Sequence, residues 1–243
     1  MKPYAAFAKV YDSFISKGFP SLHNKYLEVI QGFLEEKGLR VVRVLDTACG
    51  TGILLSLLRD NGFDATGIDL SRDMLGVAKE KGLRVYRADM ASFEMGETYD
   101  LIINFDSLNH ILKERDLARF FLCVRRHLSE DGLLIFDIDT KEKIEDKAPY
   151  WPSKRYSIGN KDIEWVNSKK QDNWVLNLNF RTNVKDGNYR ATSEKHIMKG
   201  FSLQQIKPSI KKAGLRILST YRDRVKKDSL LFICTRAKDK SSS

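Results

Sequence analysis

The chain has 243 residues, a net charge of +10 at pH 7 and a hydrophobic content of 42%. This length is enough for one sizeable core, and the apolar fraction is ordinary for a folded domain rather than a disordered chain. No apolar run comes near the roughly 20 residues of a membrane helix, and residues 1–7 lack the apolar stretch of a secretory signal. We therefore expect one cytoplasmic α/β domain with an insertion and no membrane partner.

The cysteines and histidines argue against a disulfide framework and against a metal site. Cys49, Cys123 and Cys234 are scattered along the chain without a Cys-x-x-Cys pair, and the four histidines lack metal-ligand spacing. Scattered cysteines in odd number are typical of a reducing compartment. The sequence predicts no metal cofactor.

The positive charge leaves two interpretations open. Clustered lysines and arginines neutralise phosphates, so a basic segment near the C-terminus is a candidate RNA-binding surface. This segment contains Lys207, Lys211, Lys212, Arg216, Arg222, Arg224, Lys226 and Lys227. Few aromatic residues that would stack on bases lie among these cations, so we favour a solvated surface and do not favour a nucleic-acid partner.

The first forty residues have the apolar spacing of helices. One helix is predicted over residues 4–14 and a second over residues 21–36, where Gly38 ends the pattern as a C-terminal glycine. We interpret residues 1–38 as a helical N-terminal cap.

From residue 41 the pattern changes to short apolar runs that alternate with helical ones. Strands are predicted over residues 41–45, 65–69, 84–87, 101–105 and 133–138, and helices over residues 53–61, 74–81 and 114–128. Such alternation predicts a doubly wound α/β fold in which helices cover both faces of a parallel sheet. This core is expected to span residues 39–140 and 201–237.

The alternation is interrupted between residues 141 and 200, which we interpret as an antiparallel β insertion. Strand-like runs cover residues 162–168, 174–182 and 189–198, and the pair Asp186-Gly187 predicts a hairpin turn. A helix over residues 202–213 and strands over residues 215–221 and 230–235 then complete the core. Pro208 predicts a kink in that helix or a later start.

The most informative segment is residues 46–52, Asp-Thr-Ala-Cys-Gly-Thr-Gly, between the first core strand and a helix. Gly50 and Gly52 allow a sharp turn and let the backbone approach a ligand, at the end of the sheet where doubly wound folds bind nucleotides. The spacing matches neither a Gly-x-Gly-x-x-Gly loop nor a P-loop. Asp46 would repel a pyrophosphate and suits a cationic ligand.

Two more acids follow the next two predicted strands. Asp69 stands where a carboxylate can accept hydrogen bonds from both hydroxyls of a ribose. Asp89 stands where it can meet an adenine amino group, with Met90 beside it to pack on the ring. Asp69 has the alternative of capping the next helix, although Ser71 is the better cap.

Together these residues resemble the class I S-adenosylmethionine-dependent methyltransferases. Residues 46–52 match the first motif of that family, and residues 105–110 look like its fourth. Residues 128–133 resemble its Leu-Pro-Gly-Gly turn, with Glu130 in place of the proline. The resemblance implies a mainly parallel seven-stranded Rossmann-like sheet with an antiparallel last strand, and S-adenosylmethionine as cofactor. The implied cofactor residues are Tyr4, Asp46, Ala48, Cys49, Gly50, Gly52, Asp69, Leu70, Met74, Asp89, Met90 and Phe105.

A closer resemblance is to a group of small bacterial and archaeal methyltransferases with a β insertion after the fifth strand. It rests on residues 4–12 (Tyr-x-x-Phe-Ala-x-Val-Tyr-Asp), residues 106–109 and the insertion. That group includes enzymes that act on amino groups of sugars and small metabolites. The resemblance implies that Tyr4 and Tyr11 cover the cofactor and that the insertion covers the acceptor.

His110 and Tyr11 are the candidate catalytic residues. Methyl transfer is an in-line displacement, so the enzyme chiefly orients the acceptor, and His110 could take a proton near neutral pH. His110 could equally be a helix cap or a packed side chain. His196, Trp165 and Arg181 on the insertion are further candidates for the acceptor pocket.

Two absences argue against methylation of nucleic-acid bases. Cys49 is expected to be a small loop residue rather than a nucleophile, because enzymes that methylate pyrimidine carbons carry the thiol where this chain has Asp106 and Ser107. The same region lacks the Asp/Asn-Pro-Pro-Tyr loop of adenine methylation.

We therefore predict an S-adenosylmethionine-dependent methyltransferase that acts on nitrogen or oxygen of a small-molecule acceptor. The alternatives are an RNA or protein methyltransferase that uses the basic surface and a non-catalytic S-adenosylmethionine-binding protein. A nicotinamide dehydrogenase is disfavoured by the loop sequence.

Overall fold

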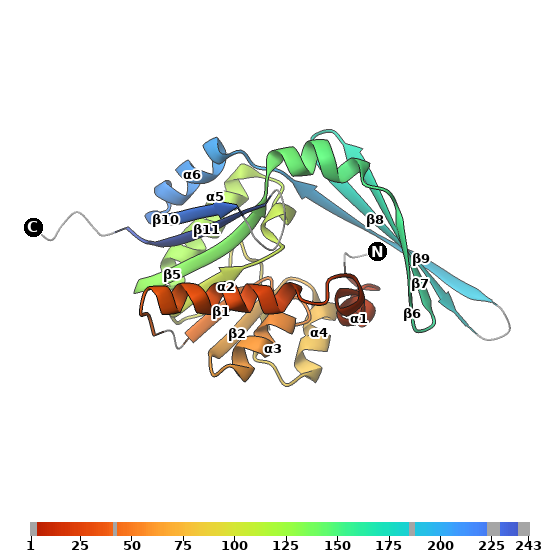
Figure 1. Ribbon diagram of the computed structural model, residues 1–243, viewed down its shortest axis with the longest axis horizontal. Helices are drawn as coiled ribbons and strands as arrows, with labels where there is room; N and C mark the ends of the chain where they lie inside the picture. The colour runs from red at the N-terminus through yellow and green to blue at the C-terminus, as the bar shows by residue number, and fades with distance from the viewer. Residues whose placement is uncertain (1–3, 41–42, 185–187, 223–228, 238–243) are drawn as a thin grey trace, which may run out of the picture.

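The computed structural model describes residues 4–40, 43–184, 188–222 and 229–237. Figure 1 shows two parts, a core in which helices cover a twisted sheet and a separate antiparallel sheet that projects from it. We call the second part the insertion sheet.

The core sheet has, within the described residues, seven strands in the order β10-β11-β5-β4-β1-β2-β3. The strands are β1 (Arg43–Thr47), β2 (Asp64–Asp69), β3 (Val85–Arg87), β4 (Tyr99–Asn104), β5 (Leu128–Asp139), β10 (Leu215–Arg222) and β11 (Ser229–Arg236). Among these strands, β11 pairs antiparallel with both β10 and β5, and the other pairs are parallel. This topology confirms the predicted doubly wound, mainly parallel sheet with an antiparallel last strand.

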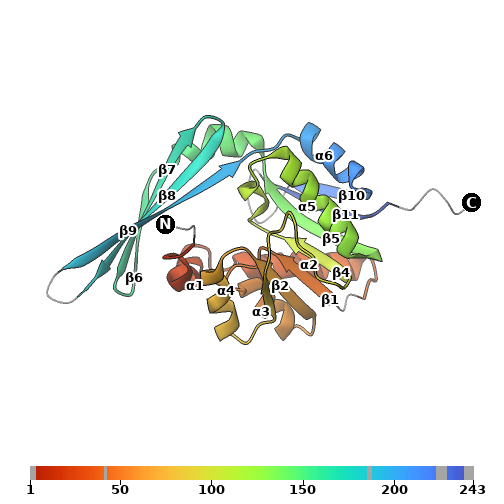
Figure 2. The same cartoon turned by 180° about the vertical axis from the view of Figure 1, so that it is seen from behind.

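Alternate residues of the central strands face opposite layers of helices. Leu101 and Ile103 of β4 pack against α2 (Leu22–Glu36) and α3 (Ile53–Asp60), whereas Ile102 packs on the side of α5 (Glu114–His127) and α6 (Leu203–Lys212). The α2 layer faces the viewer in Figure 1 and the α5 layer in Figure 2. Because both faces are covered, the strands read as continuous apolar runs.

The predicted N-terminal cap over residues 1–38 is divided in the structure. Tyr26, Ile30 and Phe33 of α2 are buried on the core sheet, so this helix belongs to the core layer. Only α1 (Ala8–Gly18) lies between the core and the insertion sheet. The cause is the wide apolar stripe of α2, which needs a large sheet surface to bury it.

The insertion sheet is antiparallel, as predicted, with the order β6-β7-β8-β9. Its strands are β6 (Lys154–Ile158), β7 (Lys161–Lys170), β8 (Asn173–Asn183) and β9 (Tyr189–Lys199). Leu176, Leu178 and Phe180 of β8 share one face and pack with Phe7 and Phe14 of the N-terminal segment. This small hydrophobic core fastens α1 to the insertion sheet.

The chain enters and leaves the insertion at one place. Thr140 forms an isolated parallel bridge with Phe201, and a Cβ on Gly200 would lie 2.6 Å from the Cα of Lys141. Asn109 donates from its side-chain amide to the carbonyl oxygens of Asp139 and Lys199, at 3.1 and 2.8 Å. These contacts hold the two ends of the insertion side by side where they leave the core.

Several local predictions differ from the structure. The first helix begins at Ala8 and not at residue 4, because the backbone N–H groups of Tyr4 and Ala6 bond to a distant carboxylate described below. The later start proposed for the helix that contains Pro208 is wrong, because a capping box of Ser202 and Gln205 starts α6 at Leu203.

Other elements were not predicted at all. The strand β6 and two short helical segments, η2 (Lys143–Lys147) and η3 (Ala148–Tyr150), lie in a stretch with prolines and no clear periodicity. The strand β5 begins at Leu128 rather than residue 133. The predicted Asp186-Gly187 turn lies outside the described residues, although β8 and β9 pair as a hairpin requires. Across the described ranges, no helix is long and apolar enough to span a bilayer.

Candidate active site

A cavity of about 1040 Å³ opens at the carboxyl ends of β1 to β4, and one edge of β9 also lines it. Most of the predicted site residues line it. These are Tyr4, Tyr11, Ala48, Gly50, Asp69, Leu70, Met74, Asp89, Met90, Phe105 and His110. The cavity has two ends. We call the part formed by Ala48, Gly50, Asp69, Asp89 and Met90 the loop end, and the part formed by Tyr4, Tyr11, His110 and His196 the insertion end.

The loop after β1 has the backbone conformation that its glycines suggested. Ala48, Gly50 and Gly52 all have positive φ, at 78°, 56° and 77°. A Cβ on Gly50 would meet open space, so this glycine leaves room beside the backbone. A Cβ on Gly52 would lie 2.3 Å from Cδ1 of Leu83. Gly52 therefore serves the packing of the loop, and it does not line the cavity.

Cys49 also faces away from the cavity. Its Sγ would lie 2.6 Å from a Cβ on Gly67, so the thiol fills the space that this glycine of β2 leaves. Burial raises the pKa of the Cys49 thiol well above its usual value. A half-buried thiol that stays protonated is a poor nucleophile, as expected for a small loop residue.

Asp46 is a buried carboxylate beneath the same loop. It is 5% exposed, and burial, followed by the charge of Asp69, raises its pKa to about 7. It does not line the cavity, and no side-chain hydrogen bond to it is found within the described ranges. An isolated buried carboxylate is costly, so a cationic group nearby would stabilise its ionised form.

Asp69 ties the glycine loop to the end of β2. Its Oδ2 accepts from the backbone N–H of Gly50 at 2.9 Å, and its Oδ1 accepts from that of Ser71 at 2.7 Å. Burial raises the pKa of Asp69 despite these hydrogen bonds, which lower it. Ser71 is the residue that caps α4 (Arg72–Glu80), because its Oγ accepts from the backbone of Met74 at 3.3 Å.

The residues after β3 complete the loop end. Asp89 accepts from the backbone N–H of Ala91 at 2.9 Å and is otherwise exposed to the cavity. The Sδ of Met90 lies 3.6 Å from the side-chain amide of Asn104, and this contact holds the Met90 side chain against the end of β4. This end thus combines two carboxylates with an apolar surface.

At the insertion end, Tyr4 and two histidines lie together. The Tyr4 hydroxyl is 3.0 Å from Nε2 of His110, which lies in η1 (Leu108–His110). The Tyr4 ring lies edge-on to that of His196 with centroids 4.4 Å apart, and the two histidine rings are 6.3 Å apart. Tyr4 has a positive φ of 66°, a strained conformation that the surrounding contacts must hold in place.

The cluster lies in surroundings that disfavour charge. Burial, followed by the electrostatic interaction with His196, lowers the pKa of His110 to about 4. Burial also raises the pKa of Tyr4 well above its usual value. Both side chains are therefore neutral at pH 7, and a neutral His110 of this kind is a weak base.

Glu194 of β9, which sequence reasoning missed, holds the N-terminal segment over the cavity. Its carboxylate accepts backbone N–H groups of Tyr4 at 2.9 Å, of Phe7 at 3.2 Å and also of Ala6. Burial alone would raise the pKa of Glu194, but the nearby His196 ring, followed by the backbone N–H groups of Ala6 and Phe7, outweighs it and lowers the pKa. One signal in the sequence could have indicated that Glu194 is buried. Side chains alternate between the two faces of a strand, so Glu194 shares a face of β9 with Met198, which is buried.

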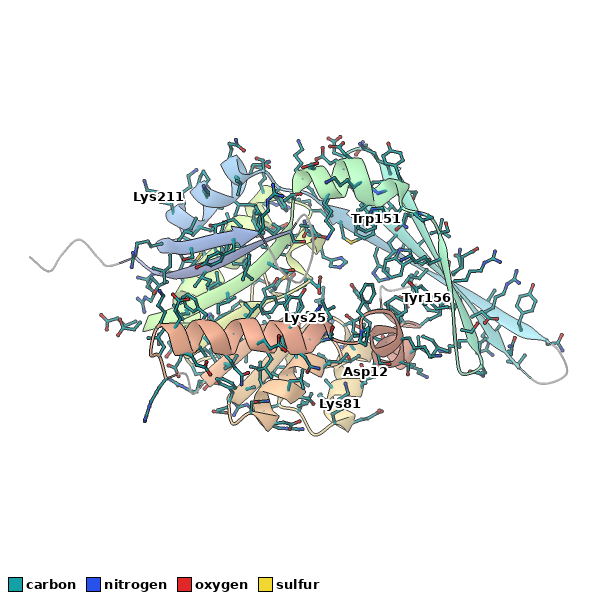
Figure 3. All side chains as sticks on the ribbon, viewed as in Figure 1. Asp12, Lys25, Lys81, Trp151, Tyr156 and Lys211 are labelled. Carbon is teal, nitrogen blue, oxygen red and sulfur yellow. The ribbon has the colours of Figure 1, made fainter. Side chains whose placement is uncertain are left out.

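A second anchor joins α1 to the glycine loop. Asp12 accepts from Oγ1 of Thr51 at 2.6 Å and forms an ion pair with Nζ of Lys81 at 2.5 Å. Lys81 also donates to the carbonyl oxygen of Thr51 at 2.8 Å. Figure 3 shows Asp12 on α1 and Lys81, which follows α4, below it. The segment that carries Tyr4 and Tyr11 is therefore fixed to both the insertion sheet and the core.

The remaining candidates lie elsewhere. Trp165 stacks on Phe14 at 5.5 Å and Arg181 lies over the ring of Tyr189 at 5.0 Å, so of the insertion candidates only His196 lines the cavity. The described members of the basic segment lie on α6 and β10, and none lines the cavity. Lys211 projects from the outer side of α6 in Figure 3. Arg224, Lys226 and Lys227 lie outside the described residues. The described residues contain no group of three or more His, Cys, Asp or Glu placed to hold a metal ion.

Comparison with known proteins assigns this arrangement to a family. The family model described as "Methyltransferase domain" matches residues 20–220. The YqeM protein of Bacillus subtilis (strain 168), which carries a methyltransferase name, is 29% identical over 225 residues, 88% of this chain and 87% of the relative.

Two solved structures have the same architecture. An S-adenosylmethionine-dependent methyltransferase from Clostridium acetobutylicum ATCC 824 has a TM-score of 0.79 and 25% identity, over 97% of this chain and 99% of that one. The sugar N-methyltransferase KedS8 from Streptoalloteichus sp ATCC 53650 has a TM-score of 0.80 and 21% identity, over 95% of this chain and 92% of that one. The sequence match and the shared fold lead to one conclusion: the chain belongs to the methyltransferase domain family and is an S-adenosylmethionine-dependent methyltransferase of the class I fold.

Proposed function

We propose that this methyltransferase acts on a nitrogen or oxygen atom of a small-molecule acceptor. The observation that carries the proposal is that one continuous cavity has two chemically different ends. Its volume of about 1040 Å³ lies at the top of the roughly 300–1,000 Å³ range of ligand pockets. The cavity therefore has room for a cofactor and a small acceptor side by side.

The loop end suits S-adenosylmethionine. Asp69 is placed to accept ribose hydroxyls, Asp89 and Met90 to meet the adenine, and the open space at Gly50 to admit the methionine part. The unpaired, buried Asp46 carboxylate beneath the loop favours a positively charged ligand. The cofactor supplies a methyl group on a sulfonium cation.

The insertion end suits an acceptor that carries an N–H or O–H group. The His110 ring also hydrogen-bonds to the backbone of Ile197, and this bond favours a proton on the ring nitrogen that makes it. The other nitrogen, Nε2, is then left to accept a hydrogen bond from the Tyr4 hydroxyl. The Tyr4 oxygen then has lone pairs left for a hydrogen-bond donor in the cavity. Tyr11, which also lines this end, narrows the space beside it.

In this arrangement His110 and Tyr11 orient the acceptor. The lowered pKa of His110 makes it a hydrogen-bond partner of Tyr4 rather than a strong base at pH 7. Orientation of this kind is the main contribution that a protein makes to an in-line displacement. A solved structure of the same fold is titled a sugar N-methyltransferase, which supports an amine as the first acceptor to test.

Calorimetric titration with S-adenosylmethionine and S-adenosylhomocysteine tests the loop end, with NAD as the control ligand. We expect saturable binding of the first two, about tenfold or more weaker in Asp69→Ala because two charge-assisted hydrogen bonds are lost. Asp60→Ala is the matched control, since Asp60 is an exposed acid that pairs with Arg59 at the end of α3. If the folded wild-type protein bound neither ligand, the assignment of the loop end as the cofactor site would be wrong.

The acceptor is tested by incubating the enzyme and S-adenosylmethionine with a panel of amino sugars, primary amines, alcohols and an RNA. Formation of S-adenosylhomocysteine from the cofactor measures turnover with each. We expect turnover with an amine or alcohol, reduced in Tyr4→Phe. Turnover confined to RNA, with a steep loss in salt, would move the function to the basic surface.

A further inference from the structure

We propose that His196 is the residue that takes the proton from the methyl acceptor, and that Glu194 is the positioning residue that holds its imidazole in place. The inference rests on the proposed function, because only an acceptor with an N–H or O–H group has a proton to give up. Neither residue was assigned this role from the sequence.

The geometry of His196 supports this role. The side chain is 4% exposed yet lines the cavity. Its Nε2 is fully buried, makes no hydrogen bond within the described residues, and lies 3.4 Å from Oε2 of Glu194. A proton on Nε2 would face the carboxylate, so Nδ1 is the nitrogen left to accept a proton from a molecule in the cavity.

His110 is less suited to the same task. Its Nε2 is already engaged by the Tyr4 hydroxyl at 3.0 Å, and its ring also bonds to the backbone of Ile197. Both ring nitrogens are therefore occupied by protein groups. The low pKa of about 4 adds to this, because a base so weak takes up little proton near neutral pH.

Glu194 supplies the charge that a protonated His196 needs. The carboxylate is 2% exposed and is held ionised by backbone N–H groups of the N-terminal segment. A buried anion next to the ring stabilises an imidazolium far more than the same anion would in water. The other titratable groups that face His196 are Tyr4 from the N-terminal segment and His110 from η1, and both are neutral.

The proton transfer balances with the methyl transfer. The acceptor atom uses a lone pair to form the bond to the methyl carbon while the carbon–sulfur bond breaks and leaves its electron pair on sulfur. The N–H or O–H bond of the acceptor then breaks, its electrons stay on the acceptor atom, and the proton moves to Nδ1 of His196. Solvent removes that proton before the next cycle.

The tautomer of His196 provides a test that needs no acceptor. We expect ¹⁵N NMR of the S-adenosylhomocysteine complex to show His196 protonated at Nε2 and unprotonated at Nδ1. In Glu194→Gln this preference should weaken, because the carboxylate that fixes it is gone. A proton on Nδ1 in the wild-type protein would overturn the proposal, since that nitrogen could not accept another.

Kinetics with an acceptor from the panel provides the second test. We expect His196→Gln to lower kcat about 10²- to 10⁴-fold, the usual worth of a general base, with the affinity for S-adenosylhomocysteine within twofold of wild type. The loss should diminish at high pH, and imidazole should partly rescue His196→Ala. Ser193→Ala on the same strand is the control.

The two arms separate the possible failures. Wild-type kcat in His196→Gln across the pH range would overturn the role of His196 while leaving the methyltransferase function intact. Loss of cofactor binding in the wild-type protein would instead overturn the proposed function. A drop in kcat with no change in pH profile and no rescue would mean that His196 only packs against Tyr4.

Discussion

The loop end of the cavity is built from residues that lie close together in the sequence, whereas the insertion end joins residues almost two hundred positions apart. Gly50 and Asp69 are 19 residues apart and bond directly, but Tyr4 and Glu194 are separated by 190 residues. The first end depends on one strand–loop–helix unit and its neighbour. The second exists only when the N-terminal segment, η1 and the insertion sheet are assembled.

This difference predicts that the two ends respond differently to change. Substitutions in the loop after β1, which supports the loop end, should act on the stability of the core as well as on cofactor binding, because the loop is packed into the core. Substitutions at the anchors of the N-terminal segment should loosen that segment and spare the core. Three experiments, from the largest expected effect to the smallest, test this comparison.

The largest effect is expected for Gly52→Ala. The new Cβ combines an unfavourable positive φ with a contact of 2.3 Å to Leu83, so we expect a loss of about 2–5 kcal/mol in the free energy of unfolding. Gly62→Ala is the control, because Gly62 also has a positive φ, of 87°, but its Cβ would meet open space. Denaturant unfolding measures both, and equal losses would show that the Leu83 contact is unimportant.

The next effect concerns the pH dependence of stability through Asp46. Burial raises its pKa to about 7 in the folded protein, against roughly 3.9 in an unfolded chain. Between these values the folded protein keeps a proton that the unfolded chain has lost. The free energy of unfolding is therefore undiminished below about pH 4, falls as the pH rises, and has lost the whole contribution once the pH has passed through about 7.

Asparagine at this position cannot ionise. We therefore expect Asp46→Asn to raise the free energy of unfolding at pH 8 by up to about 4 kcal/mol and to change it little at pH 4. The same variant should bind S-adenosylmethionine more weakly, because the anion that favours a cation is removed. Thermal unfolding at the two pH values measures the first effect, and a pH-independent difference would contradict it.

The smallest effect is expected at the anchor of α1. Asp12→Ala removes a partly exposed ion pair with Lys81 and a hydrogen bond from Thr51, which together should cost about 0.5–2 kcal/mol. Hydrogen exchange should increase in α1 but not in α2, which packs on the core sheet. A double-mutant cycle with Lys81→Met isolates the pair, and faster exchange in both helices would break the distinction between segment and core.

Much of the fold could be predicted because its signals are local. The alternation of short apolar runs with helical ones gave the doubly wound sheet, and the glycines that follow the helices marked their ends. Local signals gave weaker results where composition was polar or irregular. The strand β6 and the helical segments before it were missed for that reason.

The sequence by itself determined which residues surround the loop after β1, because backbone conformation and the order of strands bring Gly50, Asp69 and Asp89 to one edge of the sheet. It did not determine which way each side chain of that loop points, and Cys49 and Gly52 face the core instead of the cavity. Only the tertiary structure decided that α2 joins the core and that Glu194 and His196 meet Tyr4 and His110. The physical reason is that these contacts depend on the burial of distant surfaces against one another, and no local pattern records where a strand face will be buried.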